Sequence, residues 1–247
     1  MPDINVVVQN KGGVGKTVIS LIFLQWLLES DARARLIDTD PSGSIARKFR
    51  SLPITPVDVF SDGQVDPAKY DLVWEEMMIT EGALVVDTGA NAGYETLVTV
   101  LRETGIAEWL AEGGHRLRLH CVLAGGDLTS SCVVGLHRLL MDLADPVVVW
   151  LNEYEAPVEL DGKNLFEMRI YVDQPDRFAS VVQVQRRKLA LETQLLRKVL
   201  LSGLTFDEAI KSADFRMVER HRLRRLKEAW WGAMARAFPP SILEDAT

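Results

Sequence analysis

The stretch that decides the fold reads Gln9-Asn10-Lys11-Gly12-Gly13-Val14-Gly15-Lys16-Thr17. It follows a short apolar run at 4–8 and precedes a long apolar segment at 16–29, so it lies where a strand passes into a helix. Its glycines lack Cβ atoms, which lets several backbone N–H groups point toward one anion. The helix N-terminus adds a partial positive charge at the same place. The stretch therefore predicts a phosphate-binding loop rather than a glycine-rich turn with an incidental lysine.

The side chains of this loop supply further parts of a nucleotide site. Lys16 offers a point charge for the β- and γ-phosphates, and the Thr17 hydroxyl is a ligand that suits Mg²⁺. We expect the nucleotide to contact the whole turn, namely Gly12, Gly13, Val14, Gly15, Lys16, Thr17 and Val18. The predicted cofactors are thus a nucleoside phosphate, ATP or ADP, and Mg²⁺.

Short apolar runs alternate with helical segments along the rest of the chain. The expected strands cover 4–8, 34–37, 83–86, 117–123, 147–151 and 180–184. The expected helices cover about 16–29, 66–79, 94–112, 128–144, 163–172, 187–201 and 214–238. Most of the strand runs are continuously apolar, which is typical of parallel strands covered on both faces. The alternation predicts the α/β P-loop NTPase fold, a three-layer, doubly wound, mostly parallel sheet with helices on both faces.

Three details refine this expectation. The segment 117–123 alternates Arg118 and His120 with apolar residues, which favours a place toward the edge of the sheet. The segment 16–29 is too apolar for a surface helix, which predicts burial on most of its sides. Because no repeat or long linker interrupts the chain, we expect a single domain over 1–247 that ends in a basic amphipathic helix at about 214–238.

The composition limits the class of protein. The 247 residues are 47% apolar and 26% charged with a formal net charge of −7, which is ordinary for a globular chain and argues against a surface devoted to nucleic acid. Two cysteines, Cys121 and Cys132, cannot build a disulfide framework or a four-ligand zinc site. No segment reaches the roughly 20 apolar residues of a spanning helix, and the start lacks the pattern of a signal peptide. We expect a cytoplasmic protein.

Aspartates follow two of the expected strands at the point where each strand ends. Asp38-Thr39-Asp40 follows 34–37, and Asp87-Thr88-Gly89 follows 83–86. Ligands of parallel sheets bind beyond the carboxyl ends of the strands, which is where these side chains lie. Aspartates at strand ends are also common turn formers and helix caps. Beside a phosphate loop, the functional interpretation is favoured, because a hard cation and an attacking water both need oxygen acceptors.

The loop departs from the usual phosphate-loop pattern, because Asn10 stands where a glycine is common and Lys11 follows it. This Lys-Gly-Gly-Val-Gly-Lys-Thr form resembles the deviant Walker ATPases of the ParA/MinD superfamily. The resemblance implies an ATPase that forms a nucleotide-sandwich homodimer, in which Lys11 reaches the phosphates bound by the partner. There it would cancel charge that develops during phosphoryl transfer, as an arginine finger does. The alternative is that Lys11 is a solvated loop lysine.

The same resemblance implies roles for the aspartates. Asp40 would position the attacking water and so join Lys11 and Lys16 as a catalytic residue. Asp38 would act on the Mg²⁺ hydration shell, and Asp87 would be the Walker B carboxylate. With Thr17, these two aspartates form the expected metal site.

Two more expectations concern the γ-phosphate and the base. The backbone of Gly89 would approach the γ-phosphate, in a segment that lacks the prolines usual in partition proteins, so its coupling to a partner is open. Asn152, after 147–151, would read the adenine edge, which needs both a donor and an acceptor; a plain turn asparagine is the alternative. A second adenine loop falls at 185–188, without a specific motif.

Within the superfamily, the chain is most similar to small ATPases of plasmid conjugation and stability operons, the TraL/StbB type. The segments that carry this likeness are 38–41, 85–89, 148–152, 162–163 and 204–209. The likeness implies a role in plasmid transfer, stability or positioning.

The segment 214–238 holds seven basic against three acidic residues, although the whole chain is acidic. Phe215, Val218, Leu226, Trp230, Met234 and Phe238 form its apolar set. Such a helix most often packs its apolar side on the core and solvates its arginines. A face for plasmid DNA, or for a DNA-binding or conjugation partner protein, and a membrane-surface helix are the other interpretations, with the membrane less favoured.

Three functions remain open at this point. The first is an ATPase switch in which ATP joins two protomers and hydrolysis separates them. The second is a nucleotide-binding scaffold with negligible turnover, for which a water-orienting Asp40 would have no use. The third and weakest is a small-molecule kinase, which needs an acceptor pocket where the switch has its second protomer.

Overall fold

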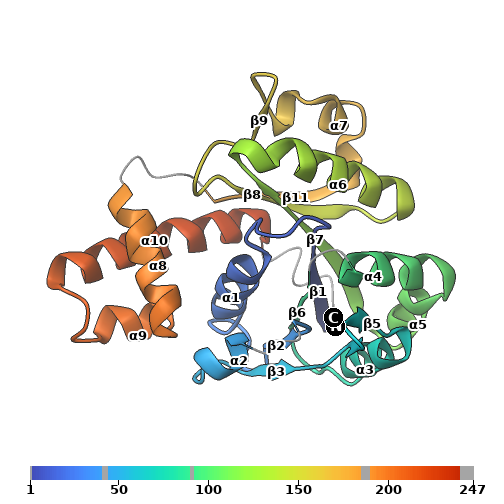
Figure 1. Ribbon diagram of the computed structural model, residues 1–247, viewed down its shortest axis with the longest axis horizontal. Coiled ribbons are helices and arrows are strands. Elements are labelled where there is room, and N and C mark those ends of the chain that lie inside the picture. Colours follow the sequence, from blue (N-terminus) through green and yellow to red (C-terminus); the bar gives the residue numbers. More distant parts are fainter. Residues whose placement is uncertain (1, 41–43, 90–91, 185–189, 240–247) are drawn as a thin grey trace.

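A parallel sheet forms the centre of the molecule (Figure 1). The computed structural model describes residues 2–40, 44–89, 92–184 and 190–239. Within these ranges, seven strands pair in the order β11-β8-β7-β1-β6-β2-β3, and every pairing is parallel. Their bounds are β1 Asp3–Val8, β2 Arg35–Asp38, β3 Ile54–Pro56, β6 Leu84–Asp87, β7 Arg116–Ala124, β8 Val147–Asn152 and β11 Phe178–Val184. The predicted parallel α/β sheet is confirmed.

Six of the strands were predicted to within a few residues, and β3 was missed. β3 spans only Ile54–Pro56 and leaves two of its three residues exposed. It pairs along one side with β2 at the end of the strand order, so it needs no continuous apolar run. Two small hairpins outside the sheet, β4 Phe60–Ser61 with β5 Gln64–Val65 and β9 Glu159–Leu160 with β10 Lys163–Asn164, were also not predicted.

Helices cover both faces of the sheet, with α1, α8 and α10 on one side and α3, α4 and α5 on the other (Figure 1). The bounds in the described chain are α1 Lys16–Leu27, α2 Ser44–Lys48, α3 Pro67–Met78, α4 Ala92–Glu103, α5 Ile106–Glu112, α6 Thr129–Asp142, α7 Arg169–Val172, α8 Ala190–Ser202, α9 Phe206–Lys211 and α10 Met217–Ala237. None of the helices described is long and apolar enough to cross a membrane.

Three helix predictions need correction. The segment 94–112 is two helices rather than one, because Gly105 adopts a left-handed conformation at φ 68° and caps α5. The segment 163–172 is mostly not helical, since it holds β10, a short 3₁₀ turn at Leu165–Glu167 and the one-turn α7. Two short helices, α2 and α9, were missed as well, although Thr205 and Glu208 form the capping box that begins α9. The first residues predicted for 187–201 lie outside the described ranges.

The strongly apolar α1 is buried, as its sequence predicts. Ile19, Leu21, Ile22, Phe23 and Leu24 are each at most 2% exposed. Its other side is covered by the end of α10, where the ring of Phe238 lies 5.2 Å from that of Phe23. The first helix, which begins in the phosphate loop, therefore lies between the sheet and the last helix.

The strand β7 lies inside the sheet, between β8 and β1, so the expectation of an edge position is wrong. Its polar residues are paired instead of solvated. Trp150 Nε1 donates to His120 Nδ1 at 2.9 Å, so the proton of the neutral ring is on Nε2, which donates to Asn5 Oδ1 at 3.0 Å. Burial lowers the pKa of His120 to about 3, which keeps the ring neutral.

The helix α10 packs on the core along an apolar side that differs in part from the predicted one. Leu226, Trp230 and Met234 are buried as expected. Val218 is 58% exposed, and Leu223, which the sequence analysis left out, is fully buried. The corrected set, Leu223, Leu226, Trp230, Ala233, Met234 and Ala237, follows the three- and four-residue spacing of one helix face.

The buried chain from Trp150 through His120 to Asn5 gives a stability prediction. Replacing Trp150 with phenylalanine removes the donor to His120 Nδ1 and leaves a buried acceptor unpaired. We expect the free energy of unfolding, measured by urea denaturation, to fall by about 1–3 kcal/mol. The matched control is Trp109→Phe, since Trp109 is 40% exposed. Equal effects of the two substitutions would contradict the proposed importance of the buried bond.

Candidate functional site

The loop between β1 and α1 has the backbone that its glycines predict. Gly13 and Gly15 have φ values of 77° and 93°, a region that side chains with a Cβ rarely adopt. Gly15 is also needed for space, because a Cβ there would lie 2.6 Å from Asn152 Nδ2. That nitrogen donates to Val14 O at 2.9 Å. The end of β8 therefore holds the loop from the side.

The side chain of Lys16 folds back onto the loop and hydrogen-bonds to its backbone. Its side chain is buried, and Nζ donates to Gln9 O at 3.1 Å and to Lys11 O at 3.4 Å. Burial lowers the pKa of Lys16, while the nearby Asp87 opposes that change. The ammonium group thus lies in the curve of the loop, where the phosphates of a nucleotide are expected.

Asp87 stands at the carboxyl end of β6 and faces the start of α1. The sheet register places it beside Val7 of β1 and Asp38 of β2. Ser20 Oγ donates to its Oδ1 at 3.0 Å, and Thr17 also hydrogen-bonds to it. Burial nevertheless raises the pKa of Asp87 to about 6. The carboxylate is therefore held in a place where its negative charge is poorly solvated.

Asp38, at the end of β2, is the second buried carboxylate. Its Oδ1 accepts from the backbone N–H of Asp40 at 3.0 Å, while its buried Oδ2 has no hydrogen-bond partner among the described residues. Burial raises the pKa of Asp38 to about 6 as well. Two buried carboxylates whose anions are disfavoured, one with an unpartnered oxygen, fit a divalent cation.

The site offers few protein oxygen donors, which suits Mg²⁺, a cation that keeps several of its waters. No cluster of three or more His, Cys, Asp or Glu that could hold a metal occurs in the part of the chain that the structure describes. Mg²⁺ usually keeps several waters and takes one or two protein ligands with substrate phosphates. Asp87 lies beside Asp38 in the sheet register and hydrogen-bonds to Thr17, so these three residues remain the expected metal site.

A cavity of about 320 Å³ lies beside the loop and brings most of the predicted residues together. Its lining consists of Gly12, Gly13, Val14, Gly15, Lys16, Thr17, Val18, Asp40, Asp87, Thr88 and Gly89. Asp40 is exposed at this cavity, which is open to solvent on that side. The exposed Lys11 and the buried Asp38, which were predicted too, lie outside the set of residues that line the cavity.

Two threonines that the sequence analysis did not single out tie the site together. Thr39 Oγ1 donates to Asp87 O at 3.0 Å and accepts from the backbone N–H of Gly89 at 3.3 Å. Thr88 Oγ1 donates to Val7 O at 2.8 Å. Thr39 therefore joins the segments that follow β2 and β6, and its place directly between Asp38 and Asp40 is the only sequence signal for this role.

A second hollow, of about 220 Å³, opens on the other side of Gly13 and Gly15. Asn152 lies in its wall with Leu128, Tyr154, Leu196 and Trp230. Both polar ends of the Asn152 amide have protein partners, since Oδ1 accepts from Tyr154 N at 3.4 Å. One amide N–H is used by Val14, so base recognition by Asn152 would rest on the second. The expected adenine loop at 185–188 lies outside the described residues.

Comparison with known proteins agrees with this geometry. The profile of the CobQ/CobB/MinD/ParA nucleotide-binding domain family matches residues 5–216. Two curated relatives, both named protein TraL from Escherichia coli, are 29% and 27% identical. They are matched over 91% and 92% of this chain and 93% and 95% of their own lengths. The MinD cell division protein of Aquifex aeolicus has a similar fold, with a TM-score of 0.51 at 15% identity over 92% of this chain and 97% of that one.

The raised pKa of Asp87 gives a prediction with a definite sign. The folded carboxyl has a pKa of about 6 and the unfolded one about 3.8, so the buried charge lowers stability as pH rises from about 4 to 6. Without Mg²⁺ and nucleotide, Asp87→Asn is expected to raise the free energy of unfolding by about 1–3 kcal/mol at pH 7.5. The gain shrinks toward zero at pH 4.

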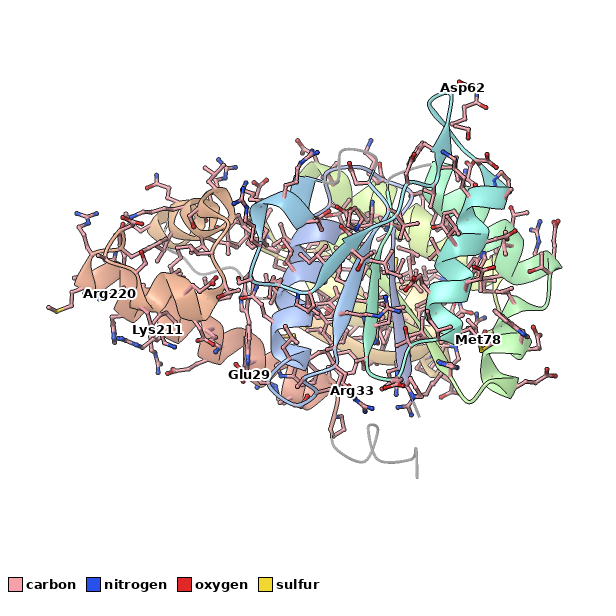
Figure 2. The ribbon with its side chains drawn as sticks, turned by 90° about the horizontal axis from the view of Figure 1, so that it is seen from below. Glu29, Arg33, Asp62, Met78, Lys211 and Arg220 are labelled. Atoms are coloured by element: carbon pink, nitrogen blue, oxygen red, sulfur yellow. The ribbon has the colours of Figure 1, made fainter. Side chains whose placement is uncertain are left out.

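Urea denaturation at the two pH values measures this difference. Asp62→Asn is the matched control, because Asp62 lies in an exposed turn (Figure 2) and does not line the cavity beside the loop. An Asp87→Asn protein that is less stable than the wild type at pH 7.5 would refute the proposed cost of the buried charge.

Proposed function

The chain belongs to the CobQ/CobB/MinD/ParA family of nucleotide-binding domains, and from this we propose that it is a Mg²⁺-dependent ATPase that dimerises with ATP. We propose further that it acts in plasmid conjugal transfer, stability or positioning. This biological role is supported by its likeness to two proteins named TraL and by the motifs that it shares with ATPases of plasmid operons. The chemistry is supported by the residues around the phosphate loop.

The observation that carries hydrolysis is the placement of Asp40. Asp40 lines the same cavity as the loop and Asp87, which is where a water attacking the terminal phosphate would need an oriented acceptor. A scaffold that only holds a nucleotide has no need of such a group. When bound, Mg²⁺ would supply positive charge that neutralises the phosphate oxygens. Thr17, Asp38 and Asp87 would hold it, with Lys16 and the loop N–H groups binding the phosphates.

Lys11 would complete the site of a second protomer. Its exposed position in the loop, outside the lining of its own cavity, suits a side chain that acts across an interface. A cation delivered in this way stabilises the charge of phosphoryl transfer and links hydrolysis to dimerisation. The ATP-bound homodimer would then be the active state, and ADP would release it.

The end of the molecule formed by α9 and α10 would contact a binding partner other than the second protomer. Arg220 and Lys211 lie there, away from the sheet (Figure 2), and the exposed Arg216 and Arg224 add to the charge. Lys227 is not available, because it forms ion pairs with Glu29 and Asp207 at 2.7 and 2.8 Å. We propose plasmid DNA or a DNA-binding conjugation protein as the partner, in preference to a membrane surface.

The trans role of Lys11 predicts a specific defect. In the Lys11→Ala protein, phosphate release should fall at least about 10³-fold, because the charge supplied across the dimer is lost. Light scattering should show wild-type dimers with a non-hydrolysable ATP analogue but monomers with ADP, and a smaller fraction of dimers for Lys11→Ala with the analogue. Lys163→Ala, at an exposed lysine of β10, serves as control. Wild-type turnover by Lys11→Ala would contradict the trans role.

Asp40→Asn separates a switch from a scaffold. We expect this protein to bind ATP and to dimerise with the analogue, but to release phosphate about 10²–10³-fold more slowly, because the attacking water is no longer oriented. Phosphate release over single and multiple turnovers measures the effect. Negligible release by the wild type, with and without DNA, would favour the scaffold.

A further inference from the structure

The side chain of Gln9, directly before the loop, makes an unusually complete set of hydrogen bonds. It is 1% exposed, and its Nε2 donates to Val122 O of β7 at 3.1 Å and to Cys132 O of α6 at 3.2 Å. Its Oε1 accepts from the backbone N–H of Asn10 at 2.9 Å. Both amide protons and the amide oxygen are therefore used within the protein. The nucleotide cavity does not include Gln9.

These bonds hold the part of the loop that carries Lys11. The backbone oxygens of Gln9 and Lys11 both accept from Lys16 Nζ on the inner side of the turn. The Gln9 side chain holds the same turn from its outer side, through Asn10 N, and ties it to α6 and β7. The short segment from Gln9 to Lys11 is thus fixed from two directions.

Gly135 of α6 makes this contact possible. A Cβ at Gly135 would lie 2.1 Å from Gln9 Oε1 and 2.6 Å from Asn10 Oδ1. Both distances are far below van der Waals contact, so any larger residue at position 135 would displace the ends of the Gln9 and Asn10 side chains and disturb the hydrogen bonds of Gln9. Glycine weakens the interior of a helix relative to alanine, and here the close approach of the loop accounts for it.

From this geometry we propose that Gln9, seated against Gly135, is a positioning residue that sets Lys11 for its contact with the partner's nucleotide. The inference rests on the proposed function, because it gives Lys11 its trans role. Asn10, which stands where glycine is common, takes part in the same contact, because its side-chain oxygen lies against Gly135. The helix α6 is then the support for a residue that acts outside its own protomer.

The first test is Gln9→Met, which keeps the length of the side chain but removes its hydrogen bonds. Gly135→Ala displaces the Gln9 and Asn10 side chains with its new methyl group while both residues stay unchanged in sequence, so it serves as the second variant if Gln9→Met fails to fold. For each protein, ATP affinity should stay within about threefold of the wild type, because the donors of residues 12–17 are unchanged. Phosphate release should fall about 10²-fold, the usual cost of misplacing a reacting group by about 1 Å.

Mixing variants distinguishes positioning of Lys11 from damage to the variant's own site. A hybrid of Gln9→Met with Asp40→Asn contains one complete site, with Asp40 from the first protomer and a well-placed Lys11 from the second. If protomers pair at random, the mixture should recover about a quarter of the wild-type rate. Lys11→Ala mixed with Asp40→Asn is the positive control, and Lys11→Ala mixed with Gln9→Met should recover nothing, because both lack a working lysine.

The outcomes separate the two proposals. Recovery with Asp40→Asn, but not with Lys11→Ala, supports positioning in trans. If Gln9→Met fails to recover with Asp40→Asn while the positive control does, the defect lies in its own nucleotide site and the inference is wrong. Absence of phosphate release by the wild type would instead contradict the proposed function.

Discussion

The structure depends on one buried ammonium group and on what surrounds it. Lys16 Nζ lies against the backbone oxygens of Gln9 and Lys11 and near the buried carboxylate of Asp87. A buried charge needs partners, and these partners come from the end of β1, the loop and the end of β6. The loop, the first helix and the centre of the sheet are therefore fixed together by the group that is expected to bind phosphate. The side chain that is expected to bind phosphate is thus also one that holds these elements together.

Two buried carboxylates form the other charged part of the site, and burial disfavours their charged form in the absence of a ligand. Asp38 and Asp87 lie side by side in the register of β2 and β6, and burial raises the pKa of each to about 6. The site without ligand thus keeps negative charge where it is poorly solvated, and a divalent cation would relieve that cost. Such a cost is expected where a protein is built to bind a charged ligand rather than to be as stable as possible.

The sequence predicted a feature well when the residues that determine it are close together in the chain, and poorly when they are far apart. The glycine-rich loop, the strands of the parallel sheet and the aspartates at the strand ends each depend on a few consecutive residues. Their positions in the fold therefore agree with the prediction. The interior place of β7 was not, because the partners that make His120 and Arg118 compatible with burial, Trp150, Asn5 and Asp3, come from other strands. The walls of the second hollow were missed for the same reason, since Leu196 and Trp230 belong to the last helices.

The helix α10 both packs on the core and lines the hollow beside the phosphate loop. Its apolar pattern alone could not show that Leu223 rather than Val218 faces the core, because these two apolar residues lie on different sides of the helix, about 140° apart. The correct side follows from what the helix packs against, namely α8, α9 and β11 along its length and α1 at its end, where Phe238 meets Phe23. Since Trp230 of the same helix lines the hollow beside Gly13 and Gly15, a nucleotide base in that hollow would touch the element that carries the exposed arginines. Nucleotide state and partner surface would then be joined through one rigid helix.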